Sequence, residues 1–287
     1  MKKIAYLLPG VLIILVLFLF FRPFGQIRLI VRGDDMGFCT DVNQACIDSY
    51  KNGILTTVEV MVPGPAFEEA AELLNENPGL EVGIHLTLTS EWDSLKWGPL
   101  THVPSLTDSN GYFFPEVFPD EHIPPERTIA GSNWKIEEIE QELRAQIEKA
   151  IAQIPHCNHL SAHMGFYHLS PQVIQLCRRL AQEYHLVANL RMLPIHPVDL
   201  LGWESSAEAM IENGVNCFKT MRPGTWIFTE HPGYDTPEMR KLGYEGELTV
   251  AARRGAVTEA FTSERLKKII KERKIKLVGY GDLGIFD

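Results

Sequence analysis

The sequence lacks the features that mark several protein classes. It has five cysteines in 287 residues, and their spacing contains no Cys-x-x-Cys pair, which excludes a disulfide-rich scaffold. It has no run of Lys or Arg, and its formal net charge is −10. Binding to nucleic acid or to anionic lipid headgroups is therefore not indicated. Internal repeats and low-complexity tracts are also missing, and the 45% hydrophobic and 22% charged composition is that of a globular protein.

One long hydrophobic run is present, at the N-terminus. Ile4–Phe21 is uninterrupted and follows Lys2 and Lys3. At a rise of about 1.5 Å per residue, this run reaches the lower end of the range for a membrane-spanning helix. We therefore expect residues 1–25 to form a membrane anchor, with the remainder of the chain outside the cytoplasm. A cleaved signal peptide, which would release a secreted protein, is the alternative.

Beyond the anchor, β-rich segments alternate with helical patterns. The predicted strands are Ile27–Arg32, Ile54–Val62, Glu81–Leu86, His159–His163, Leu186–Arg191, Asn216–Met221, Thr225–Thr229 and Ile275–Tyr280. The predicted helices are Asp41–Asn52, Pro65–Asn77, Lys135–Ile154, Pro171–Tyr184, Ser205–Asn213 and Ser263–Lys274. This alternation predicts an α/β fold with a parallel sheet, and eight strands favour a TIM-like barrel over residues 26–287.

Residues 87–134 interrupt this alternation. The segment is rich in Pro, Gly and aromatic residues and directly follows a predicted strand end. Loops of this length are uncommon in compact domains unless they are functional, and a barrel places its active site at such strand ends. The segment is therefore either a long insertion that contributes to a site or a mobile surface insertion.

Residues of the metal-ligand type follow three of the predicted strands. Asp34 and Asp35 end the first, and two adjacent carboxylates are tolerable if a cation lies between them or one stays protonated. His85 lies near the end of another strand, and His163 ends a third. Two histidines and one carboxylate from separate strand ends form a facial set that leaves positions open for water and substrate. The sequence therefore predicts a metal site.

Several of these motifs together resemble a known family, the YdjC-like carbohydrate deacetylases, also described as ChbG/HpnK-type. The matching segments occur in the family's order from about Leu29 onward. They are Asp34-Asp35-x-Gly37, Asn52–Thr57, Val82–Leu86, His231-Pro232-Gly233, Ser263-Glu264 and Tyr280–Leu283.

The resemblance implies a distorted (β/α) TIM-like barrel that hydrolyses acetamido groups of an N-acetylated sugar or oligosaccharide with a divalent metal ion, Zn or Mg. By the same resemblance, Asp35, His85 and His163 bind the metal. Asp34 is then the general base and His231 a candidate general acid. Amide hydrolysis independently requires an activated water, a centre that stabilises the oxyanion and a proton for the departing amine.

The chain departs from the family at two positions. Family members often read His-x-Asp-x-His-x-His in the fourth-strand cluster, but here Ser161 stands in place of the Asp and Gly165 in place of the last His. These departures leave open a non-catalytic, membrane-tethered glycan-binding domain. A 2-His-1-carboxylate Fe(II) oxygenase is a further alternative, disfavoured because the β/α alternation differs from the all-β pattern expected of such an enzyme.

Overall fold

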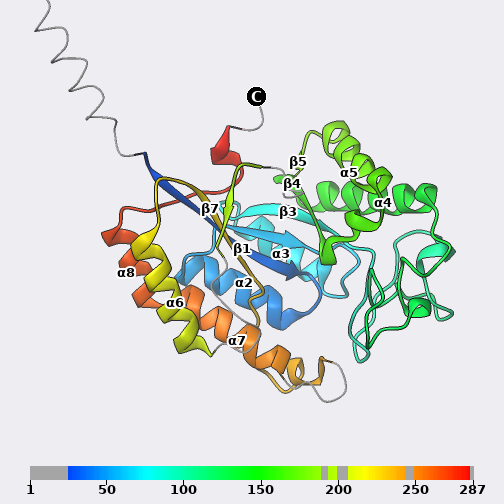
Figure 1. Ribbon diagram of the computed structural model, residues 1–287, viewed down its shortest axis with the longest axis horizontal. Helices are drawn as coiled ribbons and strands as arrows, with labels where there is room; N and C mark the ends of the chain where they lie inside the picture. Colours follow the sequence, from blue (N-terminus) through cyan, green and yellow to red (C-terminus); the bar gives the residue numbers. More distant parts are fainter. Residues whose placement is uncertain (1–24, 189–192, 199–205, 244–248, 285–287) are drawn as a thin grey trace, which may run out of the picture.

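The fold is an α/β half-barrel of parallel strands. The computed structural model describes residues 25–188, 193–198, 206–243 and 249–284 (Figure 1). The strands are β1 (Ile27–Met36), β2 (Thr57–Val60), β3 (Glu81–Leu86), β4 (Cys157–Ala162), β5 (Val187–Ala188), β6 (His196–Pro197), β7 (Gly224–Glu230) and β8 (Lys276–Leu277). Their order in the sheet is β5-β4-β3-β2-β1-β7-β6, and β8 pairs with the first part of β1. Because all pairs are parallel, the carboxyl ends of the strands meet at one edge.

The predicted closed barrel needs correction. Among the described residues no ladder joins β5 to β6, so the sheet remains open. Both of these strands have only two residues, which limits the hydrogen bonds they can offer to a further partner. The four central strands β1 to β4 pair over longer stretches and carry the site.

Seven α-helices are seen in the described part of the chain. They are α2 (Thr40–Asn52), α3 (Phe67–Glu76), α4 (Ile136–Gln153), α5 (Pro171–Glu183), α6 (Ala207–Thr220), α7 (Thr249–Thr262) and α8 (Glu264–Glu272). Apolar residues on one face explain α4, where Ile139, Leu143 and Ile147 recur every fourth residue and are buried. Polar caps set other helix starts: the Ser170 side chain accepts a hydrogen bond from the Val173 amide at the start of α5.

The C-terminal third differs most from the prediction. The expected strand Asn216–Met221 is wrong, because α6 continues through it and buries Met210, Gly214 and Phe218 at intervals of four residues. Helix α7 was not predicted. It packs against both α2 and α6, so its buried side chains do not form a single apolar stripe.

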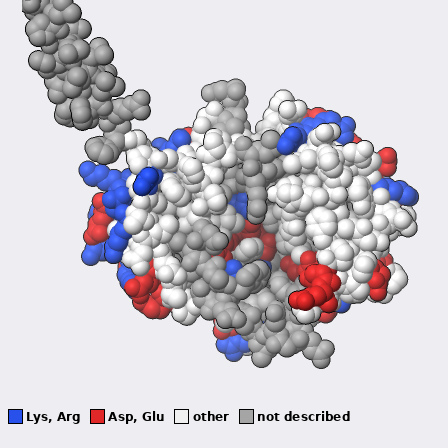
Figure 2. Space-filling view, in the orientation of Figure 1, with Lys and Arg blue, Asp and Glu red and all other residues white. Residues whose placement is uncertain are grey.

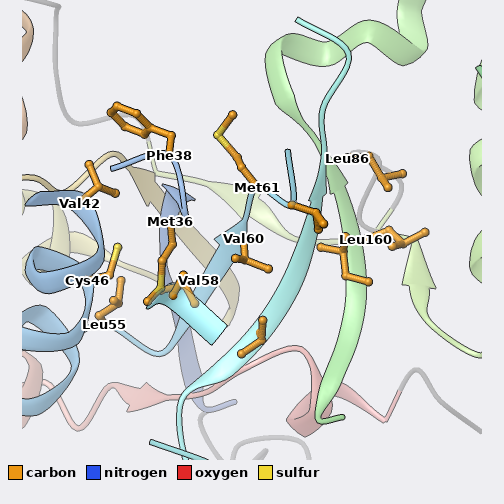
Figure 3. Packing of buried hydrophobic residues seen from close by; sticks show 14 of the residues in the cluster. Met36, Phe38, Val42, Cys46, Leu55, Val58, Val60, Met61, Leu86 and Leu160 are labelled. Atoms are coloured by element: carbon orange, nitrogen blue, oxygen red, sulfur yellow. The ribbon is translucent and has the colours of Figure 1, made fainter. Parts of the chain in front are cut away.

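The main apolar layer lies between the strands and the helices that cover them. In Figure 3, Val42 and Cys46 of α2 point toward Met36 and Val58, and all four side chains are fully buried. Side chains alternate along β2, so Val58 and Val60 face this layer while Glu59 lies on the opposite, inner face of the half-barrel. The inner face therefore carries polar groups.

The expectation of a membrane-spanning segment is also corrected. Within the described residues, no helix has the length and apolar character needed to cross a bilayer. The segment on which that expectation rested, residues 1–25, lies almost wholly outside the described residues, which begin at residue 25. The extracytoplasmic location inferred from it has no support from this finding.

The insertion between β3 and α4 is well packed. It contains two short 3₁₀ turns, η1 (Pro104–Leu106) and η2 (Pro125–Arg127), and buries Trp97 and Phe113. The buried Glu142 of α4 accepts hydrogen bonds from the insertion's backbone at Leu100 and Thr101, both at 3.0 Å. The segment is therefore fixed to the fold, on the right of Figure 1.

Candidate active site

The two adjacent carboxylates lie in a β-bulge at the end of β1. Gly33 pairs with Val58 and Met36 with Val60, so β1 has one residue more than β2 between these pairs. Asp35 has a φ of 70°, in the left-handed region that is uncommon for a residue other than glycine. Bulges of this kind redirect side chains near functional sites. Here the bulge sends Met36 into the apolar layer and leaves both carboxylates on the inner side.

Asp35 is the centre of the site. It is 2% exposed, and its Oδ1 lies 3.5 Å from His85 Nε2 and 3.3 Å from His163 Nδ1. Its Oδ2 accepts a hydrogen bond of 2.6 Å from Arg254 and lies 3.8 Å from His231 Nε2. Burial opposes ionisation, but His231 and Arg254 more than offset it and hold the pKa of Asp35 well below its usual range.

Asp35, His85 and His163 form a group able to hold a metal ion, with one ligand atom from each within 4.8 Å of the others. The other ring nitrogen of each histidine has its own partner. His85 Nδ1 lies 2.6 Å from Ser161 Oγ, and His163 Nε2 lies 3.1 Å from Glu91 Oε2. Carboxylate or hydroxyl partners of this kind orient metal-binding histidines.

The predicted general base, Asp34, is paired with Arg32. The guanidinium donates to both carboxylate oxygens, with Nε–Oδ1 and Nη2–Oδ2 distances of 2.7 and 2.6 Å. A bidentate pair of this type fixes the plane of the carboxylate. Asp34 and Asp35 therefore have different partners although they are neighbours in the chain.

His231 follows β7 directly and lies at the rim of the site. Its side chain is 41% exposed, in contrast to the buried His85 and His163. It is thus open to solvent on one side and faces the Asp35 carboxylate on the other. This is a suitable position for a group that exchanges protons with a bound substrate.

Three residues that the sequence analysis did not identify also surround the site. Arg254 comes from α7, Glu91 from the insertion and Glu59 from β2. A charged residue within the apolar β2 segment was a usable signal for Glu59. Arg254 and Glu91 had no such signal, because their helix and loop are brought to the site only by long-range packing.

Charged groups also gather in a recess on the molecular surface. Figure 2 shows Asp and Glu atoms near the middle of this face, with atoms of Lys or Arg beside them. Charges that are partly shielded from water act more strongly on one another than exposed ones do. His163 illustrates this effect, since burial lowers its pKa but Glu91 and Asp35 outweigh burial and raise it to about 10.

Comparisons with known proteins agree with this arrangement. The family model described as "YdjC-like protein" matches residues 28–272. The chain belongs to the YdjC-like family. One relative, a carbohydrate deacetylase of Brevibacillus brevis, is 29% identical over 276 residues that cover 90% of this chain and 100% of the relative. Carbohydrate deacetylase 2 of Listeria innocua is 28% identical and covers 89% of this chain and 98% of its own.

A solved structure shares the fold of this YdjC-like chain. It is that of a proposed cellobiose-phosphate cleavage protein from Enterococcus faecalis V583, with a TM-score of 0.71 and 23% sequence identity. The match covers 90% of this chain and 99% of that one. The similarity therefore extends over the whole half-barrel and is not limited to the strands of the site.

The donor set of this family member fits a divalent cation. Asp35 Oδ1 is buried and has no hydrogen-bond partner, although two histidine nitrogens lie within 3.5 Å of it. A buried carboxylate oxygen without a partner is costly, and a cation shared with the two nitrogens would satisfy it. One carboxylate and two imidazoles suit zinc and several other divalent metals.

Proposed function

We propose that the protein is a metal-dependent carbohydrate deacetylase that removes acetyl groups from an N-acetylated sugar or oligosaccharide. The observation that carries this proposal is the partnerless, buried Asp35 Oδ1 between two histidines, beside a second carboxylate that is held separately. The names of the relatives support the reaction class. Family membership over residues 28–272 supports the extension to this chain.

In this proposal Asp35, His85 and His163 hold the cation. A cation bound there would polarise the acetamido carbonyl and make a bound water more acidic. Asp34, the chain neighbour of the ligand Asp35, would serve as the base toward such a water. The two hydrogen bonds from Arg32 would fix the orientation of the Asp34 carboxylate.

His231 would give a proton to the departing amine. Its Nε2 lies 3.8 Å from Asp35 Oδ2, and its side chain is 41% exposed. The substrate would therefore enter between His231 and the insertion, which supplies Glu91.

Acetate release tests the proposal. Purified protein, stripped with a chelator and supplied with Zn²⁺ or Mg²⁺, is assayed on a panel of N-acetylated mono- and oligosaccharides. We expect release that depends on the added metal, is lost in His85→Ala and is strongly reduced in Asp34→Asn. The exposed Asp120 gives a matched control, since Asp120→Asn makes the same chemical change as Asp34→Asn away from the site. Sugar binding without acetate release under any metal would contradict the proposal and favour a glycan-binding role.

A further inference from the structure

A second group of buried polar residues lies behind His85. Glu59 and His159 are 0% exposed and Ser161 is 2% exposed. The Ser161 hydroxyl donates to Glu59 Oε2 at 2.5 Å, and His159 Nε2 lies 2.7 Å from Glu59 Oε1. Ser161 Oγ also lies 2.6 Å from His85 Nδ1. These contacts form one continuous chain from the buried carboxylate to a candidate metal ligand.

The register of three strands creates this arrangement. Glu59 of β2 pairs with Gly83 of β3, and Gly83 pairs with His159 of β4. A Cβ atom on Gly83 would overlap both Glu59 Oε2 and His159 Nε2. The missing side chain on β3 therefore allows groups from β2 and β4 to meet across it. Two residues further along β3 and β4, His85 pairs with Ser161.

Glu59 lies between two basic groups. Burial would raise its pKa, but His159 and Arg32, whose Nε lies 3.6 Å from Glu59 Oε1, outweigh burial and hold the pKa below its usual range. An ionised carboxylate can only accept hydrogen bonds. The one proton of the Ser161 hydroxyl therefore goes to Glu59, and Ser161 Oγ is left as an acceptor toward His85.

This proton count determines the tautomer of His85. Since Ser161 Oγ accepts, His85 Nδ1 must carry the ring proton and donate it. Nε2 then has a free lone pair, which faces the partnerless Asp35 Oδ1 at 3.5 Å. Two buried acceptors facing each other without a proton between them form a place for a cation.

We propose that Glu59 is a positioning residue that acts through the Ser161 hydroxyl to hold His85 in the Nδ1–H tautomer, with Nε2 directed at the Asp35–His163 site. This inference rests on the proposed function in so far as the site binds a divalent metal. The tautomer itself is a property of the chain alone. Glu59 thus acts on the site although it contacts neither Asp35 nor His163.

The first measurement is the tautomer of His85 in full-length protein freed of metal. Long-range ¹H–¹⁵N spectra give the protonation of each ring nitrogen, and the His85→Ala spectrum assigns the signals. We expect Nδ1–H in the wild type and a loss of that preference in Ser161→Ala and Glu59→Gln, since an amide can donate to Ser161 and reverse the bond. The buried Glu142 provides the matched control, and Glu142→Gln should leave the tautomer unchanged.

The second measurement is the affinity for Zn²⁺ by calorimetry. Removing an outer partner of a metal-binding histidine typically costs roughly 10–100-fold in affinity, and we expect this loss in Ser161→Ala and in Glu59→Gln. Ser161→Asp alone should also weaken binding, because it places a second carboxylate against Glu59. The double variant Glu59→Gln/Ser161→Asp removes the carboxylate at position 59 and places one directly beside His85 Nδ1. It should restore most of the affinity.

The outcomes separate this inference from the proposed function. Wild-type protein that binds no divalent cation would contradict the metal site, while its His85 tautomer would still decide the role of Glu59. An unchanged tautomer in both Glu59→Gln and Ser161→Ala would overturn the inference, even in an enzyme that releases acetate. So would a double variant that binds Zn²⁺ no better than Ser161→Asp.

Discussion

Replacing each of the two adjacent carboxylates by its amide tests the division of roles between them. In Asp34→Asn, the amide oxygen can still accept a hydrogen bond from Arg32. Glu59, 3.6 Å from Arg32, remains as a second counter-charge for the guanidinium. The cost in stability should therefore be that of one charged hydrogen bond, about 1.5–3 kcal/mol. Metal content should stay at the wild-type level, because Asp34 is not one of the three candidate ligands.

The effect of Asp34→Asn on turnover should be much larger than its effect on stability. Loss of a general base typically lowers the rate by roughly 10²–10⁴-fold, which equals about 3–5 kcal/mol of activation free energy. Asp35→Asn should behave differently, since it removes a ligand and breaks the buried 2.6 Å pair with Arg254. Breaking such a pair costs about 3–5 kcal/mol, so this variant should lose both metal and stability.

The assay pairs metal content by elemental analysis with the rate of acetate release and the denaturant midpoint for each variant. Asp120→Asn again serves as the control for the substitution itself. Equal metal loss in both site variants, or near-normal turnover in Asp34→Asn, would refute the division of roles.

Three further predictions concern other parts of the structure. Glu91→Gln should weaken Zn²⁺ binding by roughly 10–100-fold through His163 without loss of the fold; wild-type affinity by calorimetry would show that the insertion does not support the site. Gly83→Ala should destabilise the protein by about 1–3 kcal/mol in urea, because the added methyl overlaps Glu59; an unchanged midpoint would contradict this. Phe218→Ala should cost about 3–5 kcal/mol, and a much smaller loss would mean that this end of α6 is not part of the core.

Local patterns in the sequence were enough to predict the central strands and five of the helices. Glu81–Leu86 has the predicted limits in the structure, and α4 and α5 end within one residue of theirs. These segments have clear periodicity, and their burial follows from it. The strand expected at Asn216–Met221 is wrong because the apolar side chains there also suit the buried face of helix α6. Only packing against α7 and α8 decides between strand and helix.

The predicted site residues were brought together for a reason that the sequence contains. Asp35, His85 and His163 each stand at or just beyond the end of a strand, and parallel strands end at the same edge. Their separate roles stay predictions. The closed barrel was wrong as an expectation, because the ladder of the described residues stays open. The expected anchor falls almost wholly outside the described residues, among which no helix is able to span a bilayer.

The sequence by itself thus determined which residues stand at the strand ends, because strand direction and side-chain type are local properties. Only the tertiary structure decided what surrounds them. The bulge that turns Asp35 inward depends on pairing between β1 and β2, and Glu59 reaches Ser161 across 102 positions of the chain. Arg254 reaches Asp35 across 219 positions. Such contacts depend on strand register and helix packing, which no short segment encodes alone.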